Sequence, residues 1–66
     1  MFETAYFALR NHFLARPGEE FTLQQAHELW NDPYGPQQPV HLTEKALEAL
    51  ERQGTVRMRD TFYYFG

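Results

Sequence analysis

The sequence has no cysteine, no serine and only one lysine. Without cysteine, the chain forms no disulfide and offers no thiolate ligand to a metal. The usual hydroxyl and thiol nucleophiles of covalent catalysis are thereby reduced to threonine. Thr22 and Thr43 each precede an apolar helical pattern, so we interpret both as helix N-caps. The chain is therefore predicted to be a non-enzymatic protein that needs no cofactor.

Long apolar runs are absent as well. No stretch approaches the ~20 apolar residues that a membrane span requires, and Glu3 stands where a secretory signal would carry basic residues. We therefore expect a cytoplasmic protein without membrane association, which the absence of cysteine fits. His12, His27 and His41 lie on different predicted elements, and no pair has metal-ligand spacing, so we interpret them as surface or half-buried histidines.

Length and charge set further bounds. A chain of 66 residues predicts one domain, 1–66, that buries only about 60% of its unfolded surface. Its 17% aromatic residues supply dense packing, and any that stay exposed leave self-association open. Six basic and nine acidic side chains give a formal charge of −3, which disfavours sequence-independent binding to nucleic acid. A local basic patch is still compatible with that charge.

The first predicted helix spans residues 2–16. Its apolar side chains recur at helical spacing and form one stripe. The stripe consists of Phe2, Tyr6, Leu9 and Phe13. Phe7 and Leu14 lie to one side of it, and we interpret them as a candidate seam for a homodimer.

A second helix and a proline-rich loop follow. Thr22 and Gln25 predict a capping box for a helix over about 23–31. The next segment, 33–40, repeats proline every third residue, which is the spacing of a polyproline II turn. The preferred interpretation is a connector stiffened by proline, and the alternative is a displayed recognition loop. The binding residues of that alternative are Tyr34, Gln37 and Gln38.

The last third predicts a helix and a β-hairpin. Thr43 is the expected N-cap of the third helix, and Gly54 is expected to end it in the left-handed conformation. Residues 55–66 alternate with a period of two, and a two-residue turn at Asp60 and Thr61 fixes their orientation. The inward residues are then Val56, Met58, Tyr63 and Phe65, and the outward ones are Arg57, Arg59, Phe62 and Tyr64. A longer turn would shift this register. The predicted fold class is α+β, mainly α, with three helices and a C-terminal two-stranded hairpin.

The order of these elements resembles that of winged helix-turn-helix domains. The resemblance lies in FTLQQAHELW, a capped helix after a short strand, and in LTEKALEALERQGTVRMRDTFYYF, a third helix followed by a hairpin. It covers nearly the whole chain, as a pattern of apolar spacing rather than of invariant chemistry. It implies that the third helix enters the DNA major groove and that the hairpin, or wing, touches the backbone. The implied function is a DNA-binding transcriptional regulator of bacterial or phage type.

Two features depart from that pattern. The link between the second and third helices is long and rich in proline, whereas the family commonly has a short one. The outward face of the third helix also carries more acids than bases, so phosphates would repel it. That face consists of Glu44, Lys45, Glu48, Glu51 and Arg52. The alternative function is therefore a protein–protein interaction module, such as an accessory or phage protein that binds a host protein complex.

The two hypotheses use different residues. The expected nucleic-acid contacts are Lys45, Arg52, Arg57 and Arg59. The expected contacts with a protein partner are Tyr34, Gln37, Gln38, Phe62 and Tyr64. The resemblance favours the first hypothesis, and electrostatics alone favour the second. A continuous basic stripe on the folded surface would indicate nucleic acid, and arginines ringed by acids would indicate a protein partner.

Overall fold

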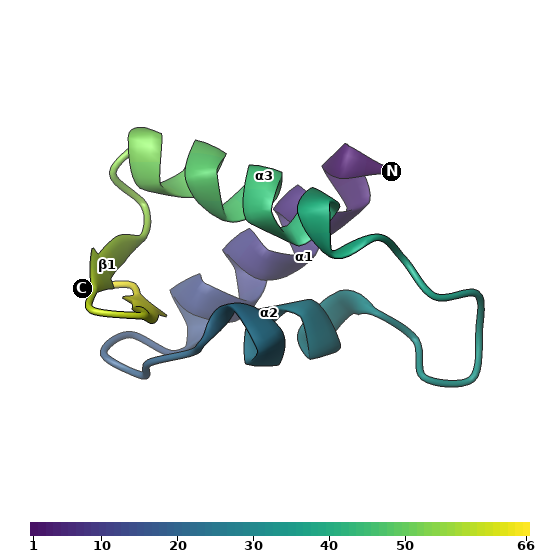
Figure 1. The fold of residues 1–66 in the computed structure, drawn as a ribbon. Coiled ribbons are helices and arrows are strands. Elements are labelled where there is room, and N and C mark those ends of the chain that lie inside the picture. The colour runs from purple at the N-terminus through teal and green to yellow at the C-terminus, as the bar shows by residue number, and fades with distance from the viewer.

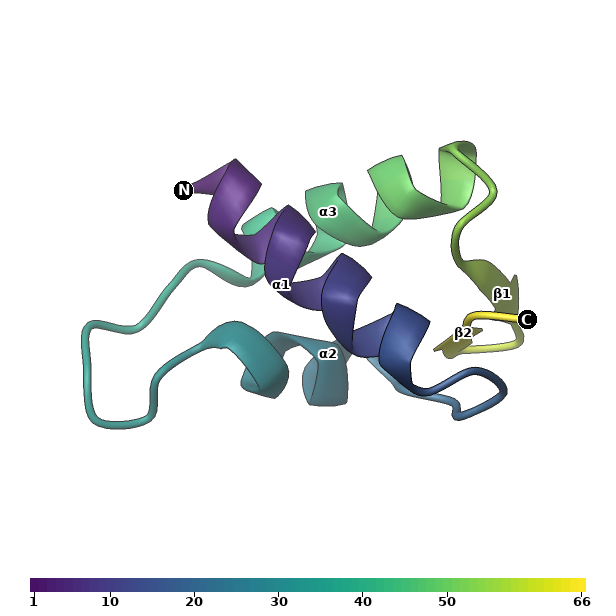
Figure 2. The same cartoon turned by 180° about the vertical axis from the view of Figure 1, so that it is seen from behind.

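The computed structural model describes every residue from Met1 to Gly66 as three helices followed by a small antiparallel sheet (Figure 1). The elements are α1 (Phe2–Ala15), α2 (Leu23–Trp30), α3 (Val40–Arg52), β1 (Arg57–Arg59) and β2 (Phe62–Tyr64). Seen from behind, α1 runs across both α2 and α3 (Figure 2). The predicted fold class, mainly α with a C-terminal two-stranded hairpin, is confirmed.

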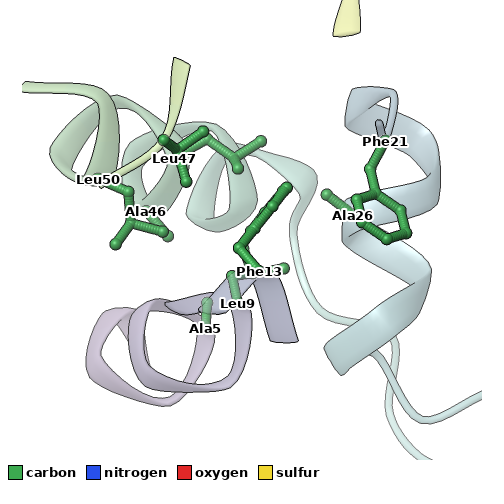
Figure 3. Close-up of a cluster of buried hydrophobic side chains, with 9 residues drawn as sticks. Ala5, Leu9, Phe13, Phe21, Ala26, Ala46, Leu47 and Leu50 are labelled. Atoms are coloured by element: carbon green, nitrogen blue, oxygen red, sulfur yellow. The ribbon is translucent and has the colours of Figure 1, made fainter. Parts of the chain in front are cut away.

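One apolar core joins the three helices to the base of the hairpin. It consists of Ala5, Leu9, Phe13, Phe21, Ala26, Ala46, Leu47, Leu50 and Val56. Phe13 is the largest of the fully buried side chains, and Figure 3 shows it reaching from α1 into the space between α3 and α2. Its ring meets that of Phe21 edge-on, with the ring centroids 5.2 Å apart. The predicted stripe of α1 is therefore the core face of that helix.

Several predicted helix ends are confirmed. The Oγ1 atom of Thr22 accepts a hydrogen bond from the backbone N–H of Gln25, whose side chain accepts one from the backbone N–H of Thr22. Gly54 adopts a φ of 81° after α3, a conformation that side chains with a Cβ atom avoid. These signals act over a few residues, so the local sequence is sufficient to predict them.

The predicted N-cap of the third helix is wrong. The helix begins at Val40, immediately after Pro39, and Thr43 lies inside it with no exposed surface. The Oγ1 atom of Thr43 accepts a hydrogen bond from Nε1 of Trp30 (2.6 Å) and lies 2.7 Å from Nδ1 of His27. A half-buried indole N–H needs a partner, so this threonine ties α2 to α3 instead of capping a helix.

The hairpin has the predicted register. Arg57 pairs with Tyr64, and the turn lies at Asp60 and Thr61, where Asp60 has a φ of 59°. Aspartate tolerates this left-handed conformation better than most residues. Met58 lies on the predicted side of the strand, but its expected burial is wrong, because 47% of this residue is exposed. The hairpin tip extends beyond the core, so the side of the strand that buries Val56 meets solvent two residues later.

A backbone bridge fastens the hairpin to the segment before α2. Phe21 and Tyr63 exchange two backbone hydrogen bonds, of 2.9 and 2.7 Å. The backbone N–H of Gly18 also donates to the carbonyl oxygen of Phe65 at 2.7 Å. Strand β2 therefore has partners on both sides, and β1 forms the free edge of the sheet.

His12 lies at the edge of the core, where its ring packs edge-on against Phe21. The Nδ1 atom of His12 is 3.1 Å from a guanidinium nitrogen of Arg16, and its Nε2 atom is buried without a hydrogen-bond partner. Burial, and then the Arg16 charge, lower the pKa of His12, and Glu19 offsets part of this effect. The folded chain therefore favours the neutral imidazole.

We expect this histidine to make the fold sensitive to acid. Its pKa is lower in the folded chain than the unfolded value of about 6.5, so its contribution to stability is present above that pH and is lost as the pH falls through the folded pKa. In urea denaturation between about pH 7 and pH 5, His12→Gln should lose less unfolding free energy than the wild type. The control His41→Gln removes an exposed histidine. Equal pH profiles for the wild type and His12→Gln would contradict this assignment.

Candidate functional site

The structure separates the residues predicted to bind a partner into two surfaces. The proline-rich loop and the hairpin lie at opposite ends of the molecule, whose longest extent is 32 Å (Figures 1 and 2). Tyr34, Gln37 and Gln38 therefore do not share a patch with Phe62 and Tyr64. The hairpin instead lies at the same end as the C-terminus of α3, which carries Arg52 (Figure 1).

The first surface, here called the hairpin surface, consists of Arg57, Met58, Arg59, Phe62 and Tyr64. The register places both arginines on the same side of the sheet as Phe62 and Tyr64. Phe62 is 37% exposed and Met58 is 47% exposed, on opposite sides of the tip. Both residues lie beside the hairpin turn, beyond Val56, the last buried residue of the core, so both stay available for contact.

Only one of the two arginines of the hairpin surface has no ion pair within the chain. Arg59 forms an ion pair with Glu20, and its guanidinium lies 5.7 Å from the centre of the Tyr64 ring. Arg57 is exposed and has no ion pair. The hairpin surface thus combines a single free cation with exposed apolar side chains.

Two other arginines also form ion pairs with glutamates. Arg16 pairs with Glu19 at 3.8 Å, and Arg52 pairs with Glu48 at 3.0 Å. With Arg59, three of the six basic side chains of the chain are therefore paired with glutamates. The basic side chains without such a pair are Arg10, Lys45 and Arg57.

The acidic face of α3 also acts on the hairpin. Burial raises the pKa of the Tyr63 phenol, and the carboxylates of Glu51 and Glu44 raise it further. Lys45 and Arg52 are exposed on the same helix, among these acids. The negative charge of α3 therefore acts as far as β2 and would repel an approaching phosphate.

Hydrogen bonds from Asn31 organise the proline-rich loop. Its Nδ2 donates to Oε1 of Gln37, and its Oδ1 accepts from the backbone N–H of Gln38, each at 2.9 Å. Asp32 accepts the backbone N–H of Tyr34 at 2.9 Å, while the Tyr34 residue is 97% exposed. Of the three residues predicted at the loop tip, Tyr34 is displayed, Gln37 bonds Asn31 through its side chain, and Gln38 bonds Asn31 through its backbone N–H.

A polar pocket lies between α2 and this loop. Its volume is about 420 Å³, and its lining residues are Gln24, His27, Glu28, Asn31, Pro33 and Gln37. Of these, only Gln37 is among the residues predicted from the sequence to bind a partner. The available signal was the spacing of Gln24, Glu28 and Asn31, which places three polar side chains on one side of a helix.

The proposed dimer seam is exposed on α1. Phe7 is 55% exposed and Leu14 is 37% exposed, and helical geometry places both on the side opposite Leu9. The ring of Tyr6 packs edge-on against that of Phe7, with centroids 5.0 Å apart. Homodimer formation through this seam stays a prediction, which sedimentation of the wild type and Phe7→Ser at high concentration tests.

The structure shows neither a cluster of metal ligands nor a membrane-spanning helix. No group of three or more His, Cys, Asp or Glu side chains is placed to hold a metal ion, and the three histidines lie on three different helices. None of the helices has the length and apolar character needed to cross a bilayer. Comparison with protein families, with curated proteins and with solved structures finds no match to this chain.

Proposed function

We propose that this chain is a non-enzymatic protein-interaction module that binds its partner through the hairpin surface. The observation that supports this proposal is the pairing of Arg16, Arg52 and Arg59 with glutamates, which leaves exposed apolar side chains beside one free arginine. Aromatic residues and arginine are the side chains that most often dominate binding energy at protein interfaces.

The chemistry of this surface fits a protein better than a phosphate backbone. A phosphate at Arg59 must compete with Glu20 for the guanidinium, in a chain whose formal charge is −3. A protein partner that encloses the hairpin tip instead gains by burying Met58 and Phe62, which are exposed on opposite sides of the tip in the free chain. One acidic residue of the partner would then pair with Arg57 and fix the orientation.

The double variant Met58→Ser/Phe62→Ser tests this proposal. Loss of a hot-spot side chain costs about 2 kcal/mol or more, which is roughly a 30-fold loss of affinity. We expect wild-type protein to capture a partner protein from cells that naturally encode it, and the double variant to lose that partner.

Leu29→Ser is the matched control, because Leu29 is 39% exposed but lies on α2. It should capture the partner as the wild type does. Circular dichroism should show that both variants keep the wild-type helix content. A folded double variant that captures the same proteins as the wild type would overturn the proposal.

DNA-binding transcriptional regulation is the second candidate function. It is favoured by the order of the elements, in which a residue bridged to the sheet precedes α2 and a hairpin follows α3. That order resembles a winged helix-turn-helix domain. In this candidate Lys45 and Arg57, which have no ion pair, make the first phosphate contacts, and Arg52 and Arg59 join them by leaving their glutamates.

Titration with mixed-sequence duplex DNA separates the two candidates. A DNA-binding chain should bind at ~50 mM salt and lose affinity steeply at ~200 mM, and Arg57→Ala should reduce the salt slope by about one unit. The interaction module should show no binding at ~50 mM salt, where phosphate contacts are strongest.

A further inference from the structure

The polar pocket beside α2 lies away from the hairpin surface and has a chemistry of its own. We propose that it binds an arginine side chain presented by an extended segment of a partner protein. The proposal rests on the proposed function only for the source of the arginine, because the pocket is formed by residues outside the hairpin surface.

The contact between His27 and Thr43 indicates which ring nitrogen of His27 carries the hydrogen. An indole N–H only donates, so Oγ1 of Thr43 accepts from Trp30. The network is satisfied when the Thr43 hydroxyl donates its own hydrogen to Nδ1 of His27, 2.7 Å away. The proton of the imidazole then resides on Nε2, which makes His27 a hydrogen-bond donor in the pocket wall.

The acceptors come from Glu28 and Gln24. The Gln24 amide donates to one oxygen of Glu28 at 3.3 Å, which leaves the other carboxylate oxygen and the amide oxygen of Gln24 free. No cation of the chain pairs with Glu28 or with the neighbouring Asp32. The pocket therefore carries negative charge without a compensating group, and a cationic ligand would supply one.

A guanidinium matches these groups better than other cations. It is planar and presents five N–H donors in a fixed fork, which suits a carboxylate oxygen beside an amide oxygen. Glu28 is the only carboxylate that lines the pocket, which is too few for a metal cage. Pro33 is the one nonpolar residue of the lining, so an apolar ligand would find few side chains to match it.

The rest of the pocket fits the chain that carries the arginine. Asn31 and Gln37 each keep an amide N–H beyond their mutual hydrogen bond, and with His27 they can donate to backbone carbonyl oxygens. A volume of about 420 Å³ leaves room for such a segment. Tyr34 follows Pro33 of the lining and is 97% exposed, so its ring is available to cover the bound chain.

A titration of isotope-labelled protein with the blocked peptide acetyl-Gly-Arg-Gly-amide tests the pocket by NMR. We expect saturable shifts in the millimolar range that centre on the lining residues. The same peptide with citrulline keeps the shape and loses the charge, so it should bind roughly tenfold more weakly. Shifts scattered over the surface, no shifts, or equal binding of the citrulline peptide would overturn the proposal.

Two substitutions define the role of the carboxylate. Glu28→Gln should weaken the arginine peptide to the level of the citrulline peptide, whereas Glu48→Gln, on the exposed face of α3, should leave its affinity unchanged. An unchanged affinity in Glu28→Gln would overturn the assignment.

The hairpin variant keeps this test separate from the proposed function. Met58→Ser/Phe62→Ser should bind the arginine peptide like the wild type, because neither residue lines the pocket. Loss of peptide binding in Glu28→Gln, with peptide binding kept in the hairpin variant, would support the pocket as a site separate from the hairpin surface. Absence of peptide binding in the wild type would remove the pocket proposal alone.

Discussion

Phe13→Ala is expected to leave the chain largely unfolded at room temperature. Phe13 has no exposed surface, and its ring packs edge-on against that of Phe21 in the centre of the core. Truncation of a buried phenylalanine to alanine costs about 3–5 kcal/mol. A single core in a chain this short rarely supplies more than about 3–5 kcal/mol of stability, so the substitution removes most or all of it.

Circular dichroism and urea denaturation measure this effect. The variant should lose the cooperative transition of the wild type or show it at a much lower urea concentration. Asn11→Ala is the matched control on the same helix, because Asn11 is exposed. It should change the unfolding free energy by no more than about 0.5 kcal/mol. A Phe13→Ala variant that unfolds at the wild-type urea concentration would contradict the assignment of the core.

Thr43→Val is expected to destabilise the fold by about 2–4 kcal/mol, although it preserves the shape of the side chain. The variant removes the hydroxyl that accepts from Nε1 of Trp30 and contacts Nδ1 of His27. Each of these groups is part-buried and has no other hydrogen-bond partner in the chain. A polar group left unsatisfied in the interior costs about 1–3 kcal/mol.

Thr43→Ser distinguishes the contribution of the hydroxyl to stability from that of the methyl group. It keeps both hydrogen bonds and removes only one buried methyl, so it should cost about 1 kcal/mol. The expected order of unfolding free energies is therefore wild type, then Thr43→Ser, then Thr43→Val. If Thr43→Val were as stable as Thr43→Ser, the hydroxyl would have no role in holding α2 against α3.

Most of the fold was predictable because its signals are local. The core stripe of α1 follows from helical spacing, and the start of α2 follows from a cap and its partner three residues later. The register of the hairpin follows from a two-residue turn at Asp60 and Thr61. Each of these features depends on neighbours in the sequence, which the chain order specifies directly.

The wrong predictions concern features that are set by contacts between residues distant in the sequence. A threonine followed by an acid is typical of an N-cap, but Trp30 and His27 need a hydroxyl partner, and Thr43 supplies it from inside α3. Alternation along β1 gave the correct side for Met58 but not its exposure, since periodicity does not tell where the core ends. Local sequence patterns do not indicate which residues of other elements a side chain will contact.

The candidate sites were only partly predictable for the same reason. The sequence identified the arginines and aromatics of the hairpin, because cross-strand geometry places them on one side. It did not show that Glu20, thirty-nine positions before Arg59, pairs with that arginine. The pocket beside α2 forms because Asn31 makes hydrogen bonds to Gln37 and Gln38, which hold the loop against the helix. Residue spacing along the sequence does not predict these hydrogen bonds.

Photo-crosslinking from the hairpin distinguishes a protein partner from DNA in the cell. Phe62 would be replaced by benzoylphenylalanine, a photoreactive analogue of similar shape, and the chain would be irradiated in cells that naturally encode it. We predict a covalent adduct with a protein, resistant to nuclease, and no such adduct when the same group replaces Leu29. A nuclease-sensitive adduct at position 62, or equal protein adducts from both positions, would contradict a protein-binding hairpin.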